Sequence, residues 1–257
     1  MQKLQPIIDG MTTISLQEMT AVKMMNRIDT KFLLNKGQLQ EAFAMLQNDY
    51  KVQTISGEVI APYRTLYFDT HDVAMYTMHH NRKLTRQKLR VRCYRQNNTT
   101  FFEFKDKNNR GKTQKTRVPV APENFDNCLA LSQVADFVAN STPYTVAELM
   151  PHVENVFNRI TLANKALTER VTIDSDIHFV NRHTGIENHS LTDLVIVEVK
   201  QDPNQRANSP IINVFRQLRI QPKRVSKYCL GTVLTNPDTK YNRFKEKIRY
   251  IEKLINS

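Results

Sequence analysis

The sequence predicts an α+β fold in which an antiparallel sheet carries charge on one face and helices are segregated from it. Three observations lead to this prediction. Segments rich in branched and aromatic residues follow one another at close spacing. Charged and apolar residues alternate within these segments. The chain has neither a Ser/Pro/Gly-rich linker nor an internal repeat, so we expect a single domain over residues 1–257.

Five helices are predicted, at residues 15–25, 38–46, 70–80, 122–139 and about 238–254. In the second, Leu39, Phe43 and Leu46 are spaced for one face. The third is entered through Thr70 or Asp72 as a cap. The last begins a basic C-terminal segment that we assign to residues 238–257.

The strands are predicted where branched and aromatic residues concentrate. The turn sequence NNRG separates two of them. They cover residues 26–35, 62–69, 88–95, 100–107, 112–120, 155–162, 169–176 and 194–200.

Charge and glycine content limit the ways in which the chain can bind an anion. The 37 Lys and Arg residues exceed the 25 Asp and Glu residues and give a net charge of +12. The six glycines are all more than five residues apart, which excludes a Walker A loop and a G-x-G-x-x-G turn. If this protein binds phosphates, it must therefore use side chains.

Cysteine and histidine placement argues against disulfides and zinc. Cys93, Cys128 and Cys229 lie far apart, and we expect a reducing compartment. No H-E-x-x-H motif or Cys/His cluster is present, and His79 and His80 are expected at a helix-end surface. No apolar run approaches the length of a membrane span or of a signal peptide. We expect a cytoplasmic protein without a membrane segment.

The alternation places cations together. On residues 88–94, the side chains of Lys88, Arg90, Arg92 and Tyr94 share one face, whereas Leu89, Val91 and Cys93 share the other. Five further strands show the same bias, with faces that carry Glu103 and Lys105; Lys115 and Arg117; Arg170, Thr172 and Asp174; Glu198 and Lys200; and Arg27, Asp29 and Lys31.

Two interpretations fit this pattern. Polar alternation on a single strand is usually the solvated face of an antiparallel sheet. Six strands with a predominance of cations are different, because like charges opposite one another destabilise a sheet. A multiply charged anion would neutralise them. We therefore favour a closed barrel with a charged lumen, whose apolar sides face outward under the helices.

The order of the motifs resembles a known family. The motifs are R-x-D-x-K at 27–31, L-R-x-R at 89–92, F-E-x-K at 102–105, K-x-x-K-x-R at 112–117, V-E-V-K at 197–200 and S-K-Y at 226–228. In this order they resemble the polyphosphate polymerase domain of the vacuolar transporter chaperone (VTC) family, within the CYTH superfamily of triphosphate tunnel metalloenzymes. The resemblance spans roughly residues 20–232.

This resemblance implies an eight-stranded antiparallel tunnel that transfers the γ-phosphate of a nucleoside triphosphate such as ATP onto a polyphosphate chain. It implies Mn²⁺ or Mg²⁺, held by Glu198 with Glu103 as a second carboxylate ligand or a water-mediated neighbour. The implied catalytic residues are Lys31, Arg90, Arg92, Lys105, Lys115, Arg170 and Lys200. The implied phosphate-binding residues are Arg27, Lys88, Arg117, Arg159, Arg224 and Lys227.

One departure bears on the reaction. Many CYTH members begin with E-x-E-x-K, whereas here Arg27 and Asp29 take the places of the two acids. This favours the polymerase branch over a two-metal triphosphatase. An inorganic or nucleotide triphosphatase of the same fold remains the alternative enzyme.

A non-catalytic polyphosphate- or nucleic-acid-binding module is the other alternative. The net charge permits it, and the basic tail with Tyr241, Phe244, Ile248 and Ile251 on one side adds weight. The chain lacks Trp and a run of surface aromatics for base stacking, which disfavours nucleic acid.

Overall fold

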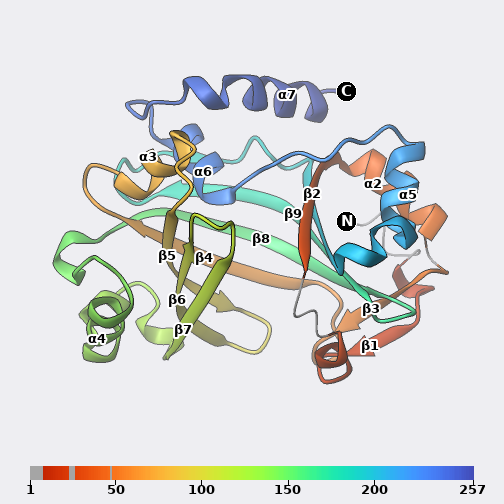
Figure 1. Ribbon diagram of the computed structural model, residues 1–257, viewed down its shortest axis with the longest axis horizontal. Coiled ribbons are helices and arrows are strands. Elements are labelled where there is room, and N and C mark those ends of the chain that lie inside the picture. Colours follow the sequence, from red (N-terminus) through yellow and green to blue (C-terminus); the bar gives the residue numbers. More distant parts are fainter. Residues whose placement is uncertain (1–7, 23–26, 47) are drawn as a thin grey trace.

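The computed structural model describes residues 8–22, 27–46 and 48–257, and one sheet dominates this part of the chain (Figure 1). Eight strands form a continuous path in which every neighbouring pair is antiparallel. In spatial order they are β2 (Ile28–Asn35), β11 (Leu194–Gln201), β9 (Glu169–Asn181), β8 (Met150–Asn164), β4 (Ala61–Asp69), β5 (Arg86–Tyr94), β6 (Thr99–Lys107) and β7 (Thr113–Val120).

Three short strands extend the sheet. β1 (Thr13–Ser15) pairs in parallel with β3 (Tyr50–Thr54), and β3 pairs with β8. β10 (Glu187–Asn188) adds to β9.

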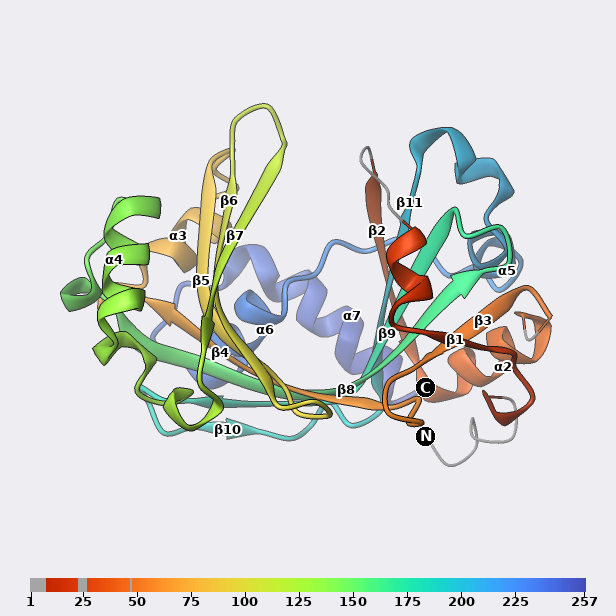
Figure 2. The same ribbon diagram turned by 90° about the horizontal axis from the view of Figure 1, so that it is seen from below.

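The sheet curves into a trough. Figure 2 shows β5, β6 and β7, the first arm, rising opposite β2 and β11, the second arm, with β4 and β8 across the floor. Register shifts between Tyr67 and Phe68 in β4 and between Val156 and Asn158 in β8 are irregularities of the kind that bend strands. No ladder joins β2 to β7 within the described ranges, so the predicted closed barrel is not confirmed. The predicted α+β class, with a large antiparallel sheet and flanking helices, is confirmed.

The helices cover the outside of both arms and one end of the trough (Figure 1). The α-helices are α2 (Lys36–Leu46), α3 (Ala74–His80), α4 (Ser132–Ser141), α5 (Pro210–Gln217), α6 (Lys227–Thr235) and α7 (Lys245–Ile255). Short 3₁₀ helices occur at η2 (Glu18–Ala21), η3 (Pro122–Asn124), η4 (Cys128–Ala130), η5 (Val146–Glu148), η6 (Pro203–Asn208) and η7 (Asn242–Phe244). No helix in the described part of the chain is both long and apolar enough to cross a membrane.

The apolar sides of the arms face outward, as predicted. Behind the second arm, Val171 and Val197 of the sheet pack in one buried cluster with Leu39 of α2 and Phe215 of α5. The first arm has its own cluster, in which the outward side chains of β5 and β6 meet Val134 and Val138 of α4. Burying these faces under helices leaves the opposite, concave face of the sheet for charged residues.

A third apolar cluster lies at one end of the trough. Tyr228 of α6 packs with Phe157 of β8 and with Ile251 of α7. Phe244, just before α7, lies against Tyr76 of α3, and the Leu254 carbonyl accepts a hydrogen bond of 3.2 Å from the Asn35 side chain. The segment 244–254 therefore spans from the α3 side of the molecule to β2, behind the space between the arms in Figure 2.

Several predicted helix boundaries were wrong. Ser15 ends β1, and its backbone and hydroxyl both donate to Glu18, so the chain turns where the first helix was expected. Residues 23–26 of that predicted helix lie outside the described residues. The predicted helix 122–139 consists of two 3₁₀ turns followed by α4, and α7 begins at Lys245 rather than near residue 238.

The remaining helix and strand predictions agree with the structure at their centres. α2 contains the predicted segment 38–46, and α3 begins only at Ala74. Of its two predicted caps, Thr70 accepts the Ala74 N–H. β1, β3, α5 and α6 were not predicted.

Candidate functional site

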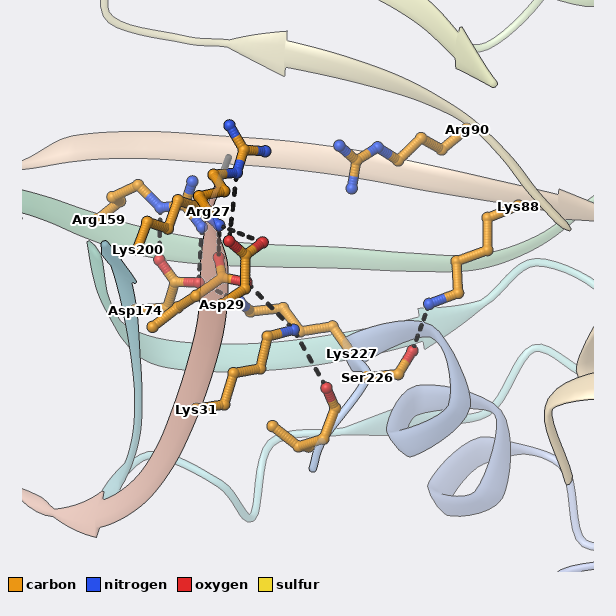
Figure 3. A network of polar contacts seen from close by, with 12 residues as sticks. Arg27, Asp29, Lys31, Lys88, Arg90, Arg159, Asp174, Lys200, Ser226 and Lys227 are labelled. Atoms are coloured by element: carbon orange, nitrogen blue, oxygen red, sulfur yellow. Dashed lines mark hydrogen bonds and ion pairs between the residues drawn. The ribbon is translucent and has the colours of Figure 1, made fainter. Parts of the chain in front are cut away.

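Lysines face one another across the first arm. Lys88 lies directly opposite Lys105, and Lys105 lies directly opposite Lys115, so that three lysines form one row across β5, β6 and β7. Like charges in this position repel one another and destabilise the sheet. Lys88 donates a 2.9 Å hydrogen bond to the Ser226 hydroxyl, which is a neutral partner (Figure 3).

Glu103 is the carboxylate that this arm places on its concave face, since Asp106 of β6 belongs to the other face. Its side chain is fully buried, accepts a 2.7 Å hydrogen bond from Nε of Arg90 and pairs with Lys115. Burial alone would raise the pKa of Glu103, but Arg90, Arg92 and Lys115 lower it to about 2. Glu103 therefore stays ionised and holds the Arg90 guanidinium in place.

The lowered pKa of Lys105 shows how strongly this arm disfavours a further positive charge. Arg90, burial and Arg92 together lower the pKa of Lys105 to about 5, against the opposing effect of Glu103. The site thus contains more positive charge than its own carboxylate neutralises.

On the floor of the trough, Asp174 joins three elements. Arg159, directly opposite on β8, donates from Nε to Oδ1 at 2.6 Å and from Nη2 to Oδ2 at 2.8 Å. Lys227, the first residue of α6, pairs with the same carboxylate. Burial would raise the pKa of Asp174, but Arg159 and Lys227 lower it to about 2. Burial, only partly offset by Asp174, lowers the pKa of Lys227 to about 8.

The second arm carries its own ion pairs. Glu198 lies 2.8 Å from Nζ of Lys200 and 3.6 Å from Nζ of Lys31. Lys200 also contacts Asp29 at 3.0 Å, and Asp29 lies 3.2 Å from Nε of Arg27 at the rim. Burial opposes ionisation, yet Lys31 and Lys200 hold the pKa of Glu198 well below its ordinary value.

The two ends of the trough differ in chemistry. At the end near α6 and α7, a cavity of about 660 Å³, here called the cationic mouth, has no Asp or Glu in its described lining. Its cations are Arg82, Lys83, Arg86, Lys88, Lys105, Lys107, Arg224, Arg243 and Lys247.

The other end, here called the aromatic mouth, is a cavity of about 540 Å³. Tyr63, Tyr94 and Phe101 line it, together with Arg117, Arg159, Arg170 and Lys200. The Arg117 guanidinium lies 4.1 Å from the Phe101 ring centroid, and Tyr63 and Tyr94 meet edge to face at 5.0 Å. Cations at this mouth are therefore interleaved with ring faces.

The predicted site residues all lie on the concave face or at its mouths. Figure 3 shows several of them converging from β2, β5, β8 and α6. The predicted set comprises Arg27, Lys31, Lys88, Arg90, Arg92, Glu103, Lys105, Lys115, Arg117, Arg159, Arg170, Glu198, Lys200, Arg224 and Lys227. For the residues on strands this common placement follows from the alternation, whereas Arg224 and Lys227 are placed by the loop before α6 and by α6 itself. The individual roles remain predictions.

The two predicted metal ligands belong to opposite arms and have different ion-pair partners. Glu103 belongs to β6 and pairs with Arg90 and Lys115, whereas Glu198 belongs to β11 and shares neither cation. No group of three or more His, Cys, Asp or Glu side chains in the described ranges is placed to hold a metal ion. The donors fit a hard divalent cation bound jointly with phosphate oxygens, which is common for Mg²⁺, but not a cage made by protein alone.

Sequence reasoning missed some residues of this site. Asp174 shares a face with Arg170 in the alternation, but only the strand register shows that it lies opposite Arg159. The aromatic mouth was also missed, although Tyr94 continues the face of Arg92. The surface prediction for the histidine pair was wrong, because His80 is buried and His79 lines the cationic mouth.

Comparisons with known proteins agree with this architecture. A presumed adenylate cyclase from Bacillus halodurans is 16% identical with a TM-score of 0.52, over 85% of this chain and 97% of that one. A presumed adenylyl cyclase from Hippeastrum is 13% identical with a TM-score of 0.53, over 81% of this chain and 96% of that one. At such identities these structures show a shared fold alone. No curated protein matches the sequence.

The family is shown by a sequence comparison. The family model for the VTC domain matches residues 26–236, which includes every strand from β2 to β11 and helix α6. The chain therefore belongs to the VTC domain family.

Proposed function

We propose that this chain binds a nucleoside triphosphate or a polyphosphate in the trough and transfers a terminal phosphoryl group, in the manner of a polyphosphate polymerase. The observation that supports this most is the lysine row on the first arm, in which Lys88, Lys105 and Lys115 are directly opposite one another. Such repulsion costs stability unless a ligand with several negative charges neutralises it. A linear chain of phosphates has this charge distribution.

The proposed chemistry requires alignment and charge stabilisation rather than a protein nucleophile. Arg90 is held by Glu103 and Arg159 by Asp174, so both guanidinium groups are oriented before a ligand arrives. Their remaining N–H groups can donate to phosphate oxygens, and the lysines add point charges. The protein thus supplies a prearranged cationic surface along the trough.

A divalent metal, Mn²⁺ or Mg²⁺, fits this proposal when Glu198 holds it together with phosphate oxygens. Glu103, on the other arm, is the proposed second carboxylate. Such an ion would neutralise charge that develops on the leaving phosphate. Both carboxylates are ionised at neutral pH, because neighbouring cations lower their pKa values.

The two mouths suggest an orientation for the substrate. A nucleoside base needs a ring face on which to stack, which Tyr94 and Phe101 offer at the aromatic mouth. A polyphosphate chain has no such need, and the lining of the cationic mouth is suited to phosphates alone. We therefore place the base at the aromatic mouth and the phosphate chain toward the cationic mouth.

The acceptor of the phosphoryl group distinguishes a polyphosphate polymerase from a triphosphatase. Transfer to the terminal phosphate of a chain gives longer polyphosphate, whereas transfer to water gives orthophosphate. Membership of the VTC domain family favours the first. The Hippeastrum protein, whose description names a dominant triphosphatase activity, favours the second, although it shares only the fold.

Incubation with ATP and Mn²⁺, followed by sizing of the phosphate products on a gel, tests this proposal. We expect a ladder of polyphosphate from the native protein and none from Arg90→Ala. Lys165→Ala, which removes an exposed lysine at the β8–β9 turn, is the matched control and should behave as the native protein. Orthophosphate alone would indicate a triphosphatase, and an unchanged ladder from Arg90→Ala would contradict the proposed site.

Competition binding separates phosphoryl transfer from nucleic-acid binding. Tripolyphosphate should displace labelled ATP from the protein, and duplex DNA at equal phosphate concentration should not. Better displacement by DNA would favour the nucleic-acid alternative.

A further inference from the structure

The C-terminal segment, residues 238–257, is fixed against α3 where it begins. Tyr76 donates a 2.8 Å hydrogen bond from its hydroxyl to the Lys240 carbonyl, and Nε2 of His80 lies 2.7 Å from the side-chain oxygen of Asn242. The ring of Phe244 stacks on that of Tyr76, with 6.0 Å between the centroids. The match to the VTC-domain model ends at residue 236, before this segment. The placement of the segment is therefore a property of this chain that the family match does not cover.

This anchoring brings cations of the segment to the cationic mouth. Arg243, Phe244 and Lys247 all line the cavity. Nζ of Lys247 lies 5.3 Å from the Phe244 ring centroid, and Lys247 belongs to the first turn of α7, where the helix dipole is positive. Burial lowers the pKa of Lys247, and Arg82 from the loop after α3 adds to this effect. Positive charge from separate parts of the chain therefore meets at this mouth.

The protein does not neutralise the cations of the cationic mouth. Within the described ranges, no ion pair joins any of them to a carboxylate. On the floor of the trough, by contrast, Arg159 and Lys227 both contact Asp174. Unpaired cations gathered around one cavity repel one another, and a ligand with several negative charges removes that repulsion. The mouth therefore has the charge that a binding site for a polyanion requires.

The cationic mouth is continuous with the lysine row on the first arm. Lys88 and Lys105 belong to the row and also line the cavity, whereas Lys115 lines neither mouth. A linear anion that contacts the row can therefore continue toward Arg243 and Lys247 along a surface that stays cationic.

We propose that the C-terminal segment forms a distal subsite for polyphosphate, in which Arg243 and Lys247 bind phosphates of a chain that extends beyond the lysine row. These side chains donate hydrogen bonds to phosphate oxygens and supply charge, and no bond to phosphorus forms or breaks there. The subsite makes affinity depend on chain length, because a tripolyphosphate held at the row does not reach it. The inference rests on the proposed function, since it requires that the trough takes a phosphate chain.

Binding of chains of different length tests this inference. Tripolyphosphate and a polyphosphate several times longer are titrated into the protein by calorimetry at several NaCl concentrations. The informative variant combines Arg243→Gln with Lys247→Gln. The matched control combines Arg249→Gln with Lys253→Gln, which removes the same charge from the same segment at two exposed positions outside the cavity lining.

We expect the informative variant to bind the long chain at least about tenfold more weakly than the native protein, with less than about twofold change for tripolyphosphate. For the long chain, the slope of log K against log NaCl concentration should be shallower by about one unit, because fewer phosphates are contacted. The control variant should keep the native affinity for the long chain within about twofold.

Two results would overturn the distal subsite and leave the proposed function intact: equal losses for the long chain and tripolyphosphate, or equal losses in the two variants. Polyglutamate that displaces the labelled long chain as effectively as unlabelled polyphosphate does would also overturn it, because the mouth would then take acidic peptides. If the native protein bound neither phosphate ligand, the inference and the proposed function would fall together.

A second measurement needs no variant. Amide hydrogen exchange of the native protein should slow over residues 243–249 when the long chain binds, because the start of α7 is then held by the ligand. Tripolyphosphate should leave exchange there unchanged. The same exchange rates in this segment with both ligands would contradict the inference.

Discussion

At the scale of single residues, like charges gathered on the concave face lower the stability of the fold. The row of Lys88, Lys105 and Lys115 places lysines directly opposite one another, and Glu103 is the carboxylate that offsets them on the concave face of this arm. Residues in such a row should increase ligand affinity while they lower the stability of the fold. Substitution of one residue at a time tests this expectation.

Lys105→Met should weaken tripolyphosphate binding by about tenfold or more, because it removes an amine that becomes protonated when phosphates neutralise the surrounding cations. Its unfolding midpoint at neutral pH should equal or exceed that of the native protein. The native pKa of Lys105 is lowered to about 5, so the unfolded chain binds more protons above that pH, and this group makes stability rise with pH. Thermal melts of the variant between pH 6 and 9 should show a smaller rise. A lower midpoint than that of Lys165→Met would contradict this account.

Tyr94→Ala should raise KM for ATP several-fold and leave tripolyphosphate affinity unchanged, since stacking on one aromatic ring contributes about 1–3 kcal/mol. The ring lines the aromatic mouth and lies edge to face against Tyr63. Measuring KM for ATP and affinity for tripolyphosphate in the same variant compares the two effects. Equal losses for ATP and tripolyphosphate would place the base elsewhere.

Glu198→Gln should shift the Mn²⁺ concentration for half-maximal turnover upward by about tenfold or more, because an amide oxygen is a weaker ligand for a hard cation than a carboxylate. Tripolyphosphate binding without metal should be unchanged or tighter, because one negative charge leaves the trough. A metal titration of turnover that matched the native protein would reject Glu198 as a ligand.

At the scale of elements, the strands were predictable and the end of the trough was not. Strict alternation on β5 and β6 fixes which side chains share a face, whatever the partner strand. α6 is different: its sequence KYCLGTVLT contains Gly231 and β-branched residues, which disfavour a helix on local grounds. Tertiary packing decides its structure, because the helix must fit closely against β8 and β9.

Gly231→Ala tests this explanation. A Cβ at Gly231 would lie 2.6 Å from side-chain atoms of Phe179 and Val153, both of them buried. We expect the free energy of unfolding to fall by about 1–3 kcal/mol, as for other overpacked cores. Gly37→Ala in α2 is the control, where the new Cβ meets only the Asn35 side chain at 3.4 Å and helix propensity should make the change neutral or favourable. Chemical denaturation measures both, and equal stabilities would show that α6 tolerates a wider spacing.

The sequence also contains a helix-start signal from which no helix was predicted. α5 starts with Ser209 as a cap and Pro210 in its first turn, which is typical of a helix start. The residues of the candidate site were found where they alternate with apolar ones on strands. Asp174 and the aromatic mouth were missed because both depend on which residues lie opposite one another on neighbouring strands. Alternation within one strand does not specify this.

At the scale of the whole molecule, the sequence predicted a closed barrel with a charged interior, and the structure confirms the charged concave face but not the closure. Alternation fixes which face of each strand is charged and says nothing about whether the first and last strands meet. That depends on strand tilt and register. In the structure the path ends at β2 on one side and at β7 on the other.

The net charge of +12 gives a prediction for the molecule as a whole. Self-repulsion should make the unfolding midpoint rise with NaCl concentration, because salt screens the like charges. Tripolyphosphate should raise the midpoint at much lower concentration than NaCl, and this advantage should shrink as salt increases. Differential scanning fluorimetry over both titrations measures this. A midpoint that falls with salt would mean that attractive pairs dominate the electrostatics of the fold.

The outer edge of β7 has one more consequence. A sheet that stops without a neighbour offers its backbone amides and carbonyls to any second copy of the molecule, which is the usual route to aggregation. Here that rim bears Lys115 and Arg117, and Pro119 lacks an amide hydrogen to offer. Two such rims repel each other, so the side chains that we propose for phosphate binding would also oppose edge-to-edge pairing of two copies.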